Sequence, residues 1–522
     1  MKEIAKQWRE EWQFRGKRVF LITLVIGLLT HAFRLTNIML CADSANYLHT
    51  ISVSWVMALG RIFLPAVEIV RGNYELTWLI GLASIVFTGL AAVAVVSLFD
   101  TRKRIGEILI AWIMVANPVV TGIFGYMYTA DGYFFGMFLA VLSVWFCAKQ
   151  SGIKGFAFGA LALYVSLGFY QGFLTTAIML ILLWLYTRLI TPGVSLKQFW
   201  REFLRFLGMG VTAVVPYYIT IHLVWRFSEY GSVNYMGLET MDGFNFSVIT
   251  TALTDCCINF ARFFLVRWEA NFYNISNVLM FVYLAGVLLG LLTKRKLWKE
   301  PGRIVILFVL LLCIPFAVHI FEFMSGGVSY NSIPMSYGIA MLYLAPVLLF
   351  SEWGEKESEA ENKKYLLKTA GIILMLLICC NFSIVANRAY ASMENANTKV
   401  EMLLNRLVTR MEMTPGYSED MEVCIIGSCY QIPEYVDRAP MMSGVVSNIF
   451  ISQDTEYVNL MNWYMGTSYY CASFERKKEL VNTEEFAGME QWPAENSIRI
   501  IDSTILLYLS DVDLDRLLGE DE

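Results

Sequence analysis

Charged residues are scarce in this sequence. Lys, Arg, Asp and Glu together make up 16% of the 522 residues, whereas about a quarter is usual for soluble domains. Hydrophobic residues make up 57%, and they come in runs long enough to cross a bilayer. The composition therefore excludes a soluble globular protein and favours an integral membrane protein.

Metal-binding and nucleotide-binding motifs are also missing. The sequence has only four histidines, and its ten cysteines form no CxxC pair and no Cys/His cluster with metal-ligand spacing. No Gly-rich phosphate loop is present, and no basic patch suggests nucleic acid. We therefore expect no cofactor and no nucleic-acid partner, and the sequence leaves a divalent-metal requirement open.

What the sequence does contain is a series of long apolar runs. A membrane-spanning helix needs about 20 apolar residues, and the runs predict an all-α polytopic membrane protein with about eleven transmembrane helices, embedded in a lipid bilayer. The predicted spans are Val19–Leu35, Leu76–Phe99, Ile105–Tyr126, Tyr133–Cys147, Phe156–Phe169, Phe173–Leu189, Phe206–Trp225, Ile275–Thr293, Ile304–Phe323, Pro334–Phe350 and Leu366–Ile384.

Basic residues in every second connection set the predicted orientation. Lys and Arg gather before the first span and after the second, fourth, sixth, eighth and tenth, as in Arg102-Lys103-Arg104 and Lys294-Arg295-Lys296. Positively charged connections stay in the cytoplasm. We therefore expect a multi-pass protein of the bacterial plasma membrane with a cytoplasmic N-terminus.

The residues after the last span form a separate predicted unit on the extracytoplasmic side. The chain is thus divided into a membrane domain, residues 1–386, and a small α/β domain, residues 387–522. Its predicted elements are an amphipathic helix at Asn395–Met411, buried strands at Glu422–Gly427 and Ile498–Ile505, and a terminal helix at Leu514–Leu518.

Polar side chains gather in the connections on the predicted outer side. A single acid at a membrane surface is usually only a solvated residue, but charges near membrane depth are costly unless they serve a site. The candidates are Asp43, Tyr47, His49, Trp55 and Arg61 in the first outer connection, Asp131 in the second, Tyr170 and Gln171 in the third, and Arg262 and Arg267 in the fourth.

Three short segments resemble a known family. Asp43 followed by Trp55-Val56-Met57-Ala58-Leu59-Gly60-Arg61, then Ala130-Asp131-Gly132-Tyr133, then Ser166-Leu167-Gly168-Phe169-Tyr170-Gln171 are similar in order and spacing to motifs of the GtrII glucosyltransferases. These bacterial membrane enzymes decorate cell-surface polysaccharides. The resemblance covers roughly the first half of the chain. One departure is that the family commonly has two adjacent acids where Asp43 stands between Ala42 and Ser44.

The resemblance implies a GT-C-like architecture and a polyprenyl-phosphate sugar as donor, with a polysaccharide or cell-wall glycan as acceptor. It implies that Asp43 is the catalytic base and that Asp131 is a second catalytic carboxyl group. Arg61 would bind the donor phosphate, with Arg262 and Arg267 as weaker phosphate candidates, because arginine offers two parallel donors to phosphate oxygens. The residues expected to orient the substrates are Tyr170, Gln171, Tyr47, His49 and Trp55.

Two other functions stay open at this point. A flippase or transporter of lipid-linked sugars would also have many spans, but it would carry ionisable residues along the middle of several of them. A polysaccharide polymerase or ligase would place its functional residues in large outer connections, and the segment Arg226–Asn274 fits that pattern. A structural scaffold is the least favoured reading.

Overall fold

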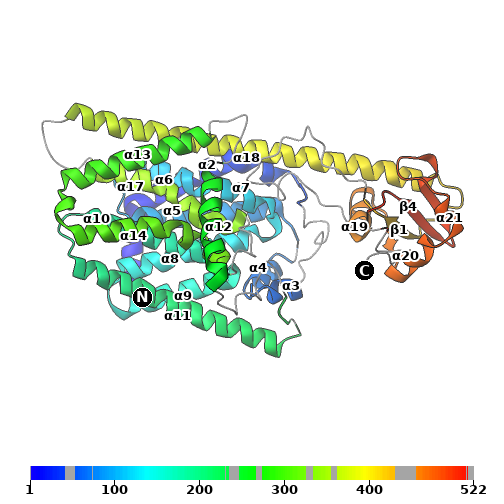
Figure 1. Cartoon of the computed structure of the whole chain (residues 1–522), viewed down its shortest axis with the longest axis horizontal. Helices are drawn as coiled ribbons and strands as arrows, with labels where there is room; N and C mark the ends of the chain where they lie inside the picture. The colour runs from blue at the N-terminus through cyan, green and yellow to red at the C-terminus, as the bar shows by residue number, and fades with distance from the viewer. Residues whose placement is uncertain are drawn as a thin grey trace. The chain divides into compact units, whose positions relative to one another are not determined.

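The computed structural model of the chain describes residues 2–41, 53–72, 74–229, 231–233, 246–265, 273–324, 333–353, 361–428, 454–512 and 514. The chain divides into two compact units (Figure 1). The first, the helical unit, comprises residues 1–37 and 51–387. The second, the sheet unit, comprises residues 38–50 and 388–522.

The helical unit is built from long apolar helices with short helical turns between them. Its first elements are α1 (Lys2–Glu11), η1 (Trp12–Gly16), α2 (Lys17–Thr36), α3 (Val53–Ala58), α4 (Leu64–Val70), α5 (Thr77–Leu98), α6 (Arg104–Ala116), α7 (Pro118–Gly125), α8 (Met127–Lys149), α9 (Gly152–Phe169) and α10 (Phe173–Ile190). They are followed by α11 (Leu196–Phe227), α12 (Phe246–Leu265), α13 (Tyr273–Lys294), η4 (Leu297–Lys299), α14 (Pro301–Val318), α15 (Ile320–Met324), η5 (Ile333–Ser336), α16 (Tyr337–Ala340), η6 (Met341–Tyr343), α17 (Leu344–Trp353) and α18 (Glu361–Glu412).

Ten helices among the described residues are long and apolar enough to cross a membrane. The protein is therefore a multi-pass membrane protein with an all-helical membrane part, as the apolar runs predict. The predicted span Pro334–Phe350 is wrong as a single long helix, because η5, α16, η6 and α17 replace it. Pro346 lacks an N–H and clashes with the carbonyl four residues earlier, and the helix accordingly restarts at Leu344 with the proline in its first turn.

Two further predicted boundaries differ from the structure. The predicted span Leu366–Ile384 and the separate helix Asn395–Met411 are parts of one helix, α18. No glycine or proline follows Gly371 within α18, so nothing in the sequence breaks the helix there. Asp131, predicted to lie in a short loop, instead lies in the second turn of α8.

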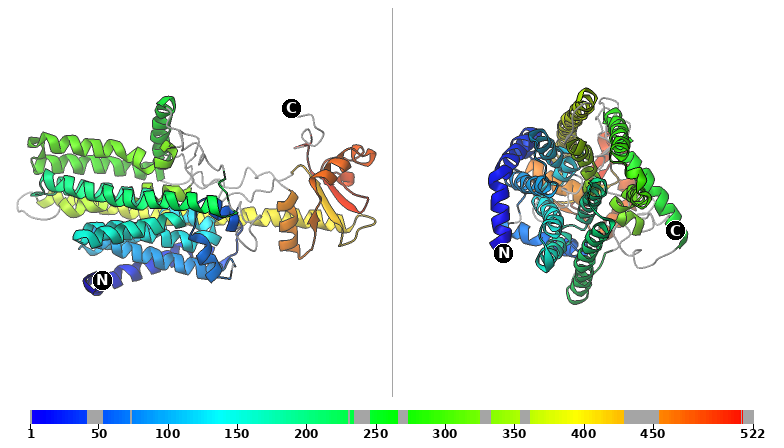
Figure 2. Two further views of the ribbon diagram at one scale, coloured as in Figure 1. Left: turned by 90° about the horizontal axis from the view of Figure 1, so that it is seen from below. Right: turned by 90° about the vertical axis from the view of Figure 1, so that its left-hand side faces the viewer.

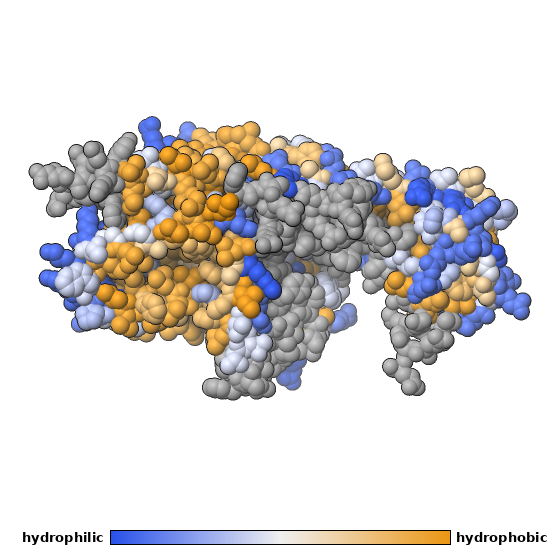
Figure 3. All heavy atoms as spheres, turned by 45° about the horizontal axis from the view of Figure 1, so that its top comes forward, coloured by the Kyte–Doolittle hydropathy of each residue, from blue (hydrophilic) through white to orange (hydrophobic). Residues whose placement is uncertain are grey.

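The surface of the helical unit fits a hydrocarbon environment. Along α11, one residue in every three or four is a large hydrophobic side chain that is about half exposed, as with Leu207, Val211, Val215 and Ile219. Figure 3 shows hydrophobic residues over much of this unit. Exposing such a stripe of apolar side chains to water would be unfavourable in free energy, whereas contact with lipid tails is favourable.

Helix α8 lies at the centre of the helical unit and packs against α5, α9 and α10, while α2 packs against α5 and α6. Most of these helices run in nearly the same direction, whereas α12 crosses them in both views (Figures 1 and 2). The span formed by α6 and α7 breaks at Asn117-Pro118. There the Asn117 side chain accepts hydrogen bonds from the backbone N–H groups of Val119 and Val120, at 3.1 and 3.4 Å, and caps α7.

The sheet unit has a four-stranded sheet with strand order β2-β1-β4-β3, built from β1 (Glu422–Ile426), β2 (Tyr470–Cys471), β3 (Ile498–Ile501) and β4 (Thr504–Tyr508). β1 is parallel to β2 and β4, and β3 is antiparallel to β4. β1 forms where a buried strand is predicted, whereas the predicted strand Ile498–Ile505 is a hairpin. The helices of the sheet unit are α19 (Asp454–Met465), α20 (Phe474–Val481) and α21 (Glu484–Ala487), with η8 (Glu495–Ser497) before β3.

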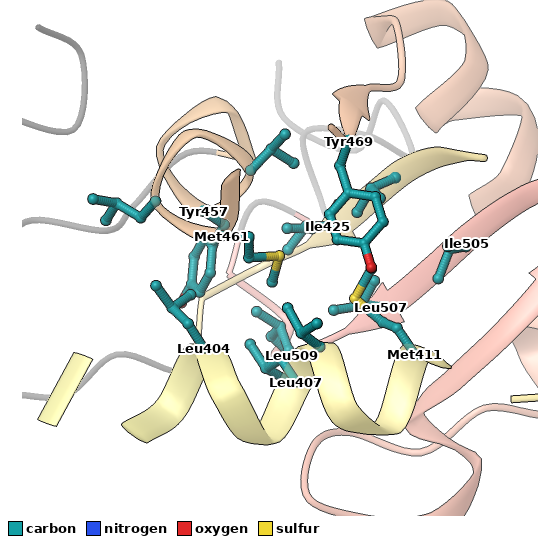
Figure 4. Close-up of a cluster of buried hydrophobic side chains, with 14 of the residues drawn as sticks. Leu404, Leu407, Met411, Ile425, Tyr457, Met461, Tyr469, Ile505, Leu507 and Leu509 are labelled. Atoms are coloured by element: carbon teal, nitrogen blue, oxygen red, sulfur yellow. The ribbon is translucent and has the colours of Figure 1, made fainter. Parts of the chain in front are cut away.

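Both faces of the sheet are covered, because alternate residues of β1 point to opposite sides. On one face, Ile425 packs with Leu404 and Leu407 of α18 and with Tyr457 and Met461 of α19 (Figure 4). The opposite face is covered by side chains from α20 and α21, namely Leu480, Val481 and Phe486, which pack on Cys424 and Ile426. The predicted terminal helix Leu514–Leu518 lies outside the described residues except for Leu514.

Candidate functional site

The three motif segments of the sequence meet at one end of the helical unit, around the turn that joins α3 to α4. This turn, residues 59–63, is named the Arg61 turn below. Gly60 adopts a φ of +75°, a conformation that glycine accepts without steric cost. The Gly60 carbonyl accepts a hydrogen bond from the Tyr217 hydroxyl at 2.9 Å, and the Leu59 carbonyl accepts one from Gln171 Nε2 at 2.6 Å. The turn is therefore held by side chains from α11 and from the α9–α10 connection.

A close backbone approach fixes the other side of the Arg61 turn. The Phe63 N–H donates a hydrogen bond to the Gly168 carbonyl at 2.9 Å. A Cβ atom added to Gly168 would lie 2.2 Å from the Phe63 ring, so no larger residue fits there without displacing the turn. Gly168 and Gln171 belong to the same motif segment, and both act on the turn that carries Arg61.

Arg61 lies over two tyrosine rings. Its guanidinium carbon is 5.1 Å from the centroid of the Tyr170 ring and 5.8 Å from that of Tyr133. The two rings stack on one another with centroids 4.6 Å apart and planes 24° from parallel. Cation–π attraction of this kind orients the arginine side chain.

The second motif segment supplies three contacts through three neighbouring residues of α8. Tyr133 stacks beneath Arg61, and Gly132 lets α4 approach closely, since an added Cβ there would lie 2.5 Å from Leu64 Cδ1. The third contact is an ion pair in which Arg71 Nε lies 3.1 Å from Asp131 Oδ2, with both side chains less than a tenth exposed. Arg71 also donates to the carbonyls of Tyr128 and Tyr74, at 2.6 and 3.2 Å.

A third charged residue completes this cluster. Glu68 lies on α4 one turn before Arg71, and its side chain is only 3% exposed. Burial raises the pKa of the Glu68 carboxyl to about 8, while Arg71 lowers the pKa and Asp131 raises it. A further acid nearby in the sequence, Glu75, lies 3.6 Å from the buried Arg34, and burial raises the pKa of Glu75 as well.

The structure brings together some of the predicted site residues and leaves others apart. Tyr170 and Gln171 contact the turn that carries Arg61, and Asp131 pairs with Arg71 at the end of α4. Trp55 lies half-buried on α3, which leads into the turn. Arg262 is exposed on α12 and donates to Asn259 Oδ1 at 3.4 Å. No hydrogen bond or ion pair joins it to the Arg61 turn within the described ranges. The remaining candidates, Asp43, Tyr47, His49 and Arg267, lie outside the described residues.

Two members of the cluster were not chosen from the sequence. Glu68 and Arg71 stand three residues apart, a spacing that places two residues on one face of a helix, but the sequence does not show that this face is buried. Among the described residues, no group of three or more His, Cys, Asp or Glu side chains is placed to hold a metal ion.

Comparison with known protein families identifies the chain. The family model for glucosyl transferase GtrII matches residues 32–350, which is more than half of the sequence. The chain belongs to the GtrII glucosyltransferase family. Membership implies glucosyl transfer, with a donor and an acceptor substrate and a membrane location. No curated protein and no solved structure matches the chain.

The GtrII match covers every residue of the Arg61 turn and of the Glu68–Arg71–Asp131 cluster. It ends at residue 350, before α18, and it includes residues 38–50 of the sheet unit. The match therefore covers most of the helical unit and, of the sheet unit, only residues 38–50, which contain Asp43.

Proposed function

We propose that this GtrII glucosyltransferase moves a glucosyl residue from a polyprenyl-phosphate carrier to a cell-surface polysaccharide or cell-wall glycan, on the extracytoplasmic side of the membrane. The observation that carries the proposal is the convergence of three GtrII-like segments on one buried, charged site. The outer location is supported by the basic connections Arg102-Lys103-Arg104 and Lys294-Arg295-Lys296, which follow α5 and α13 and so lie at the other ends of the helices.

The chemistry proposed for the site is a single displacement. The acceptor hydroxyl oxygen bonds to the anomeric carbon while the bond from that carbon to the phosphate oxygen breaks, and the electron pair leaves with the phosphate. The configuration at the anomeric carbon is thereby inverted. The Asp43 carboxylate takes the hydroxyl proton, because a neutral hydroxyl is a weak nucleophile. Arg61 stabilises the negative charge that develops on the phosphate.

The contacts around Arg61 support its proposed role as phosphate ligand. Tyr133 and Tyr170 hold the guanidinium by its face, and the planar fork of arginine matches the geometry of phosphate oxygens. Gln171 fixes the backbone of the turn through the Leu59 carbonyl. Its role in this account is therefore to position Arg61.

An apolar cavity in the helical unit supports a lipid-linked donor. It has a volume of about 310 Å³ and lies between α10, α12, α13, α14 and η6–α17. The first turn of α10 contacts the tyrosines of the site through Phe173, and the next turns of the same helix line the cavity, beginning at Met179. α10 thus runs from the tyrosines of the site to the cavity, whose apolar lining suits an isoprenoid chain.

The Asp43→Asn variant tests the proposed function in cells. Losing a positioned general base costs about 10²–10⁴ in rate, so the variant should leave the surface glycan without its added hexose. Mass spectrometry of the glycan compares cells with the wild-type gene, without the gene and with the variant. A matched control, Asp242→Asn, changes an acid in another predicted outer connection and should keep the hexose. The same glycan mass with and without the gene would contradict the proposal.

A further inference from the structure

Glu68 is a buried carboxyl group that the mechanism above does not use. Its side chain is 3% exposed, and its Oε1 atom has no hydrogen-bond partner among the described residues. A buried ionised carboxylate without partners is costly. Such a group is stable in this position when it carries a proton, and a protonated carboxyl group needs an acceptor.

The charges around Glu68 are already matched without it. Arg71 is committed to the Asp131 carboxylate and to two backbone carbonyls. Of the helices that pack most closely on α4, α8 contributes Asp131 and α3 contains no ionisable residue. Glu75, whose pKa is raised by burial and lowered in part by Arg71, is paired with Arg34. Two acids therefore share one arginine, and the cluster is neutral when one of the acids holds a proton.

The ion pair decides which acid holds the proton. Asp131 is the one in direct contact with Arg71, so Asp131 keeps the negative charge. Burial is the main cause that raises the pKa of Glu68 to about 8, with Arg71 lowering it and Asp131 adding to the rise. Burial also disfavours the charged form of Asp131, but there the direct contact with Arg71 opposes that effect. Two acids whose environments differ in this way are typical of sites that need one proton donor and one charged group.

We propose that Glu68 is the general acid of this site and gives its proton to the phosphate oxygen of the leaving carrier. This inference rests on the proposed function. Arg61 lies in the turn between α3 and α4, and Glu68 lies seven residues later on α4, so one short segment carries both the proton donor and the proposed phosphate ligand.

The proton inventory of the step balances. The bond between the anomeric carbon and the phosphate oxygen breaks, and that oxygen takes the electron pair and the proton from Glu68. The acceptor hydroxyl gives its proton to Asp43 as its oxygen bonds to the anomeric carbon. Water then returns a proton to Glu68 and removes one from Asp43, so both groups regain their starting states.

The pH profile of turnover tests the proposal. The full-length protein is reconstituted in lipid nanodiscs, and kcat is measured with polyprenyl-phosphate glucose for wild type, Glu68→Gln and Glu75→Gln. Wild type should lose activity as the pH rises through about 8, because Glu68 then loses its proton. Glu68→Gln should be slower by about 10²-fold and should show no loss near that pH, since glutamine does not titrate. Glu75→Gln, another buried acid whose pKa is raised by burial, should keep the wild-type profile.

The outcomes separate this inference from the proposed function. A wild-type protein that transfers no glucose from this donor would contradict both the proposed function and the role of Glu68. An active wild type whose Glu68→Gln variant keeps the alkaline loss, or keeps full turnover, would overturn the role of Glu68 alone.

Chemical labelling of the wild-type protein tests the same proposal if the Glu68→Gln variant does not fold. A hydrophobic carbodiimide, which modifies protonated carboxyl groups, should label Glu68 near neutral pH and label it less above about pH 8. Peptide mapping by mass spectrometry that finds no label on Glu68, or a label independent of pH, would overturn the assignment.

Discussion

Arg61 is the residue whose surroundings are most specific to arginine. Its planar guanidinium lies against Tyr170 and Tyr133, and lysine can neither stack in this way nor offer two parallel donors. Arg61→Lys should therefore lower kcat/KM for the donor by about 10–100-fold, the equivalent of about 1.5–3 kcal/mol for a hydrogen bond to a charged group.

The control for this exchange is Arg102→Lys in an exposed basic connection, which should behave as wild type. Melting temperature is measured beside donor kinetics. A variant that loses several degrees of stability and keeps its turnover would assign Arg61 a structural role instead.

Glu68 also makes stability depend on pH. Its pKa in the folded protein, about 8, lies above the ordinary value of 4.5, so the folded state binds the proton more tightly than the unfolded state does. Stability is then lost as the pH rises from about 4.5 to about 8. Glu68→Gln escapes this loss, and its melting temperature relative to wild type should become more favourable across that range. A constant difference between the two proteins at all pH values would contradict the shifted pKa.

At the residue scale, the roles of the site residues chosen from the sequence stay predictions, and the structure shows which of them lie close together. The motif residues Tyr170 and Gln171 contact the Arg61 turn, and Asp131 pairs with Arg71 at the other end of α4. The Glu68–Arg71 pair could not be chosen from the sequence, since its importance depends on burial and on the contact of Arg71 with Asp131, which only the packing of α4 on α8 creates.

At the scale of elements, the apolar cavity gives a direct test of where the lipid chain lies. Ala285 on α13 lines the cavity, and Ala285→Trp would fill part of it. Val282→Trp is a matched control on the same helix, because Val282 is 64% exposed and does not line the cavity. We expect Ala285→Trp to raise the donor KM at least several-fold and Val282→Trp to leave it unchanged. Equal KM values for both variants would place the isoprenoid chain elsewhere.

The apolar runs predicted most of the long helices because length and hydrophobicity alone decide them. The prediction of a single long helix over residues 334–350 failed because Pro346 restarts the helix as α17.

The prediction of a single strand over residues 498–505 failed for a different reason. Asp502 and Ser503, at φ of 46° and 65°, form a two-residue turn between β3 and β4. Asp-Ser is not among the usual sequences of such turns, so the hairpin was not visible in the sequence.

At the scale of the whole molecule, the orientation in the membrane is the prediction with the widest consequences. A single cysteine at Ser44 or Asn245 should react with an impermeant thiol reagent from outside the cell, and one at Lys103 or Lys296 should be protected. The accessible native cysteines are replaced first, and labelling is measured in intact cells and after permeabilisation. The reverse pattern would move the site to the cytoplasm and remove the basis for an outer-leaflet donor.

The two units differ in how much of each the GtrII family match covers. The GtrII match lies in residues 32–350, within which the whole candidate site falls. The sheet unit has a core of its own beneath α18 and α19 (Figure 4). The assignment of residues 387–522 as an extracytoplasmic domain stays a prediction. It depends on the same membrane orientation, so the reverse labelling pattern in the cysteine test would contradict it as well.

The measurement that most directly tests the central claim is a choice between donors. Purified protein in lipid nanodiscs is given a cell-surface or cell-wall glycan acceptor and either polyprenyl-phosphate glucose or a nucleotide glucose, with the sugar labelled. The account predicts label in the glycan from the polyprenyl donor and none from the nucleotide sugar. Transfer from the nucleotide sugar alone, or movement of the lipid-linked sugar across the bilayer without transfer, would contradict it.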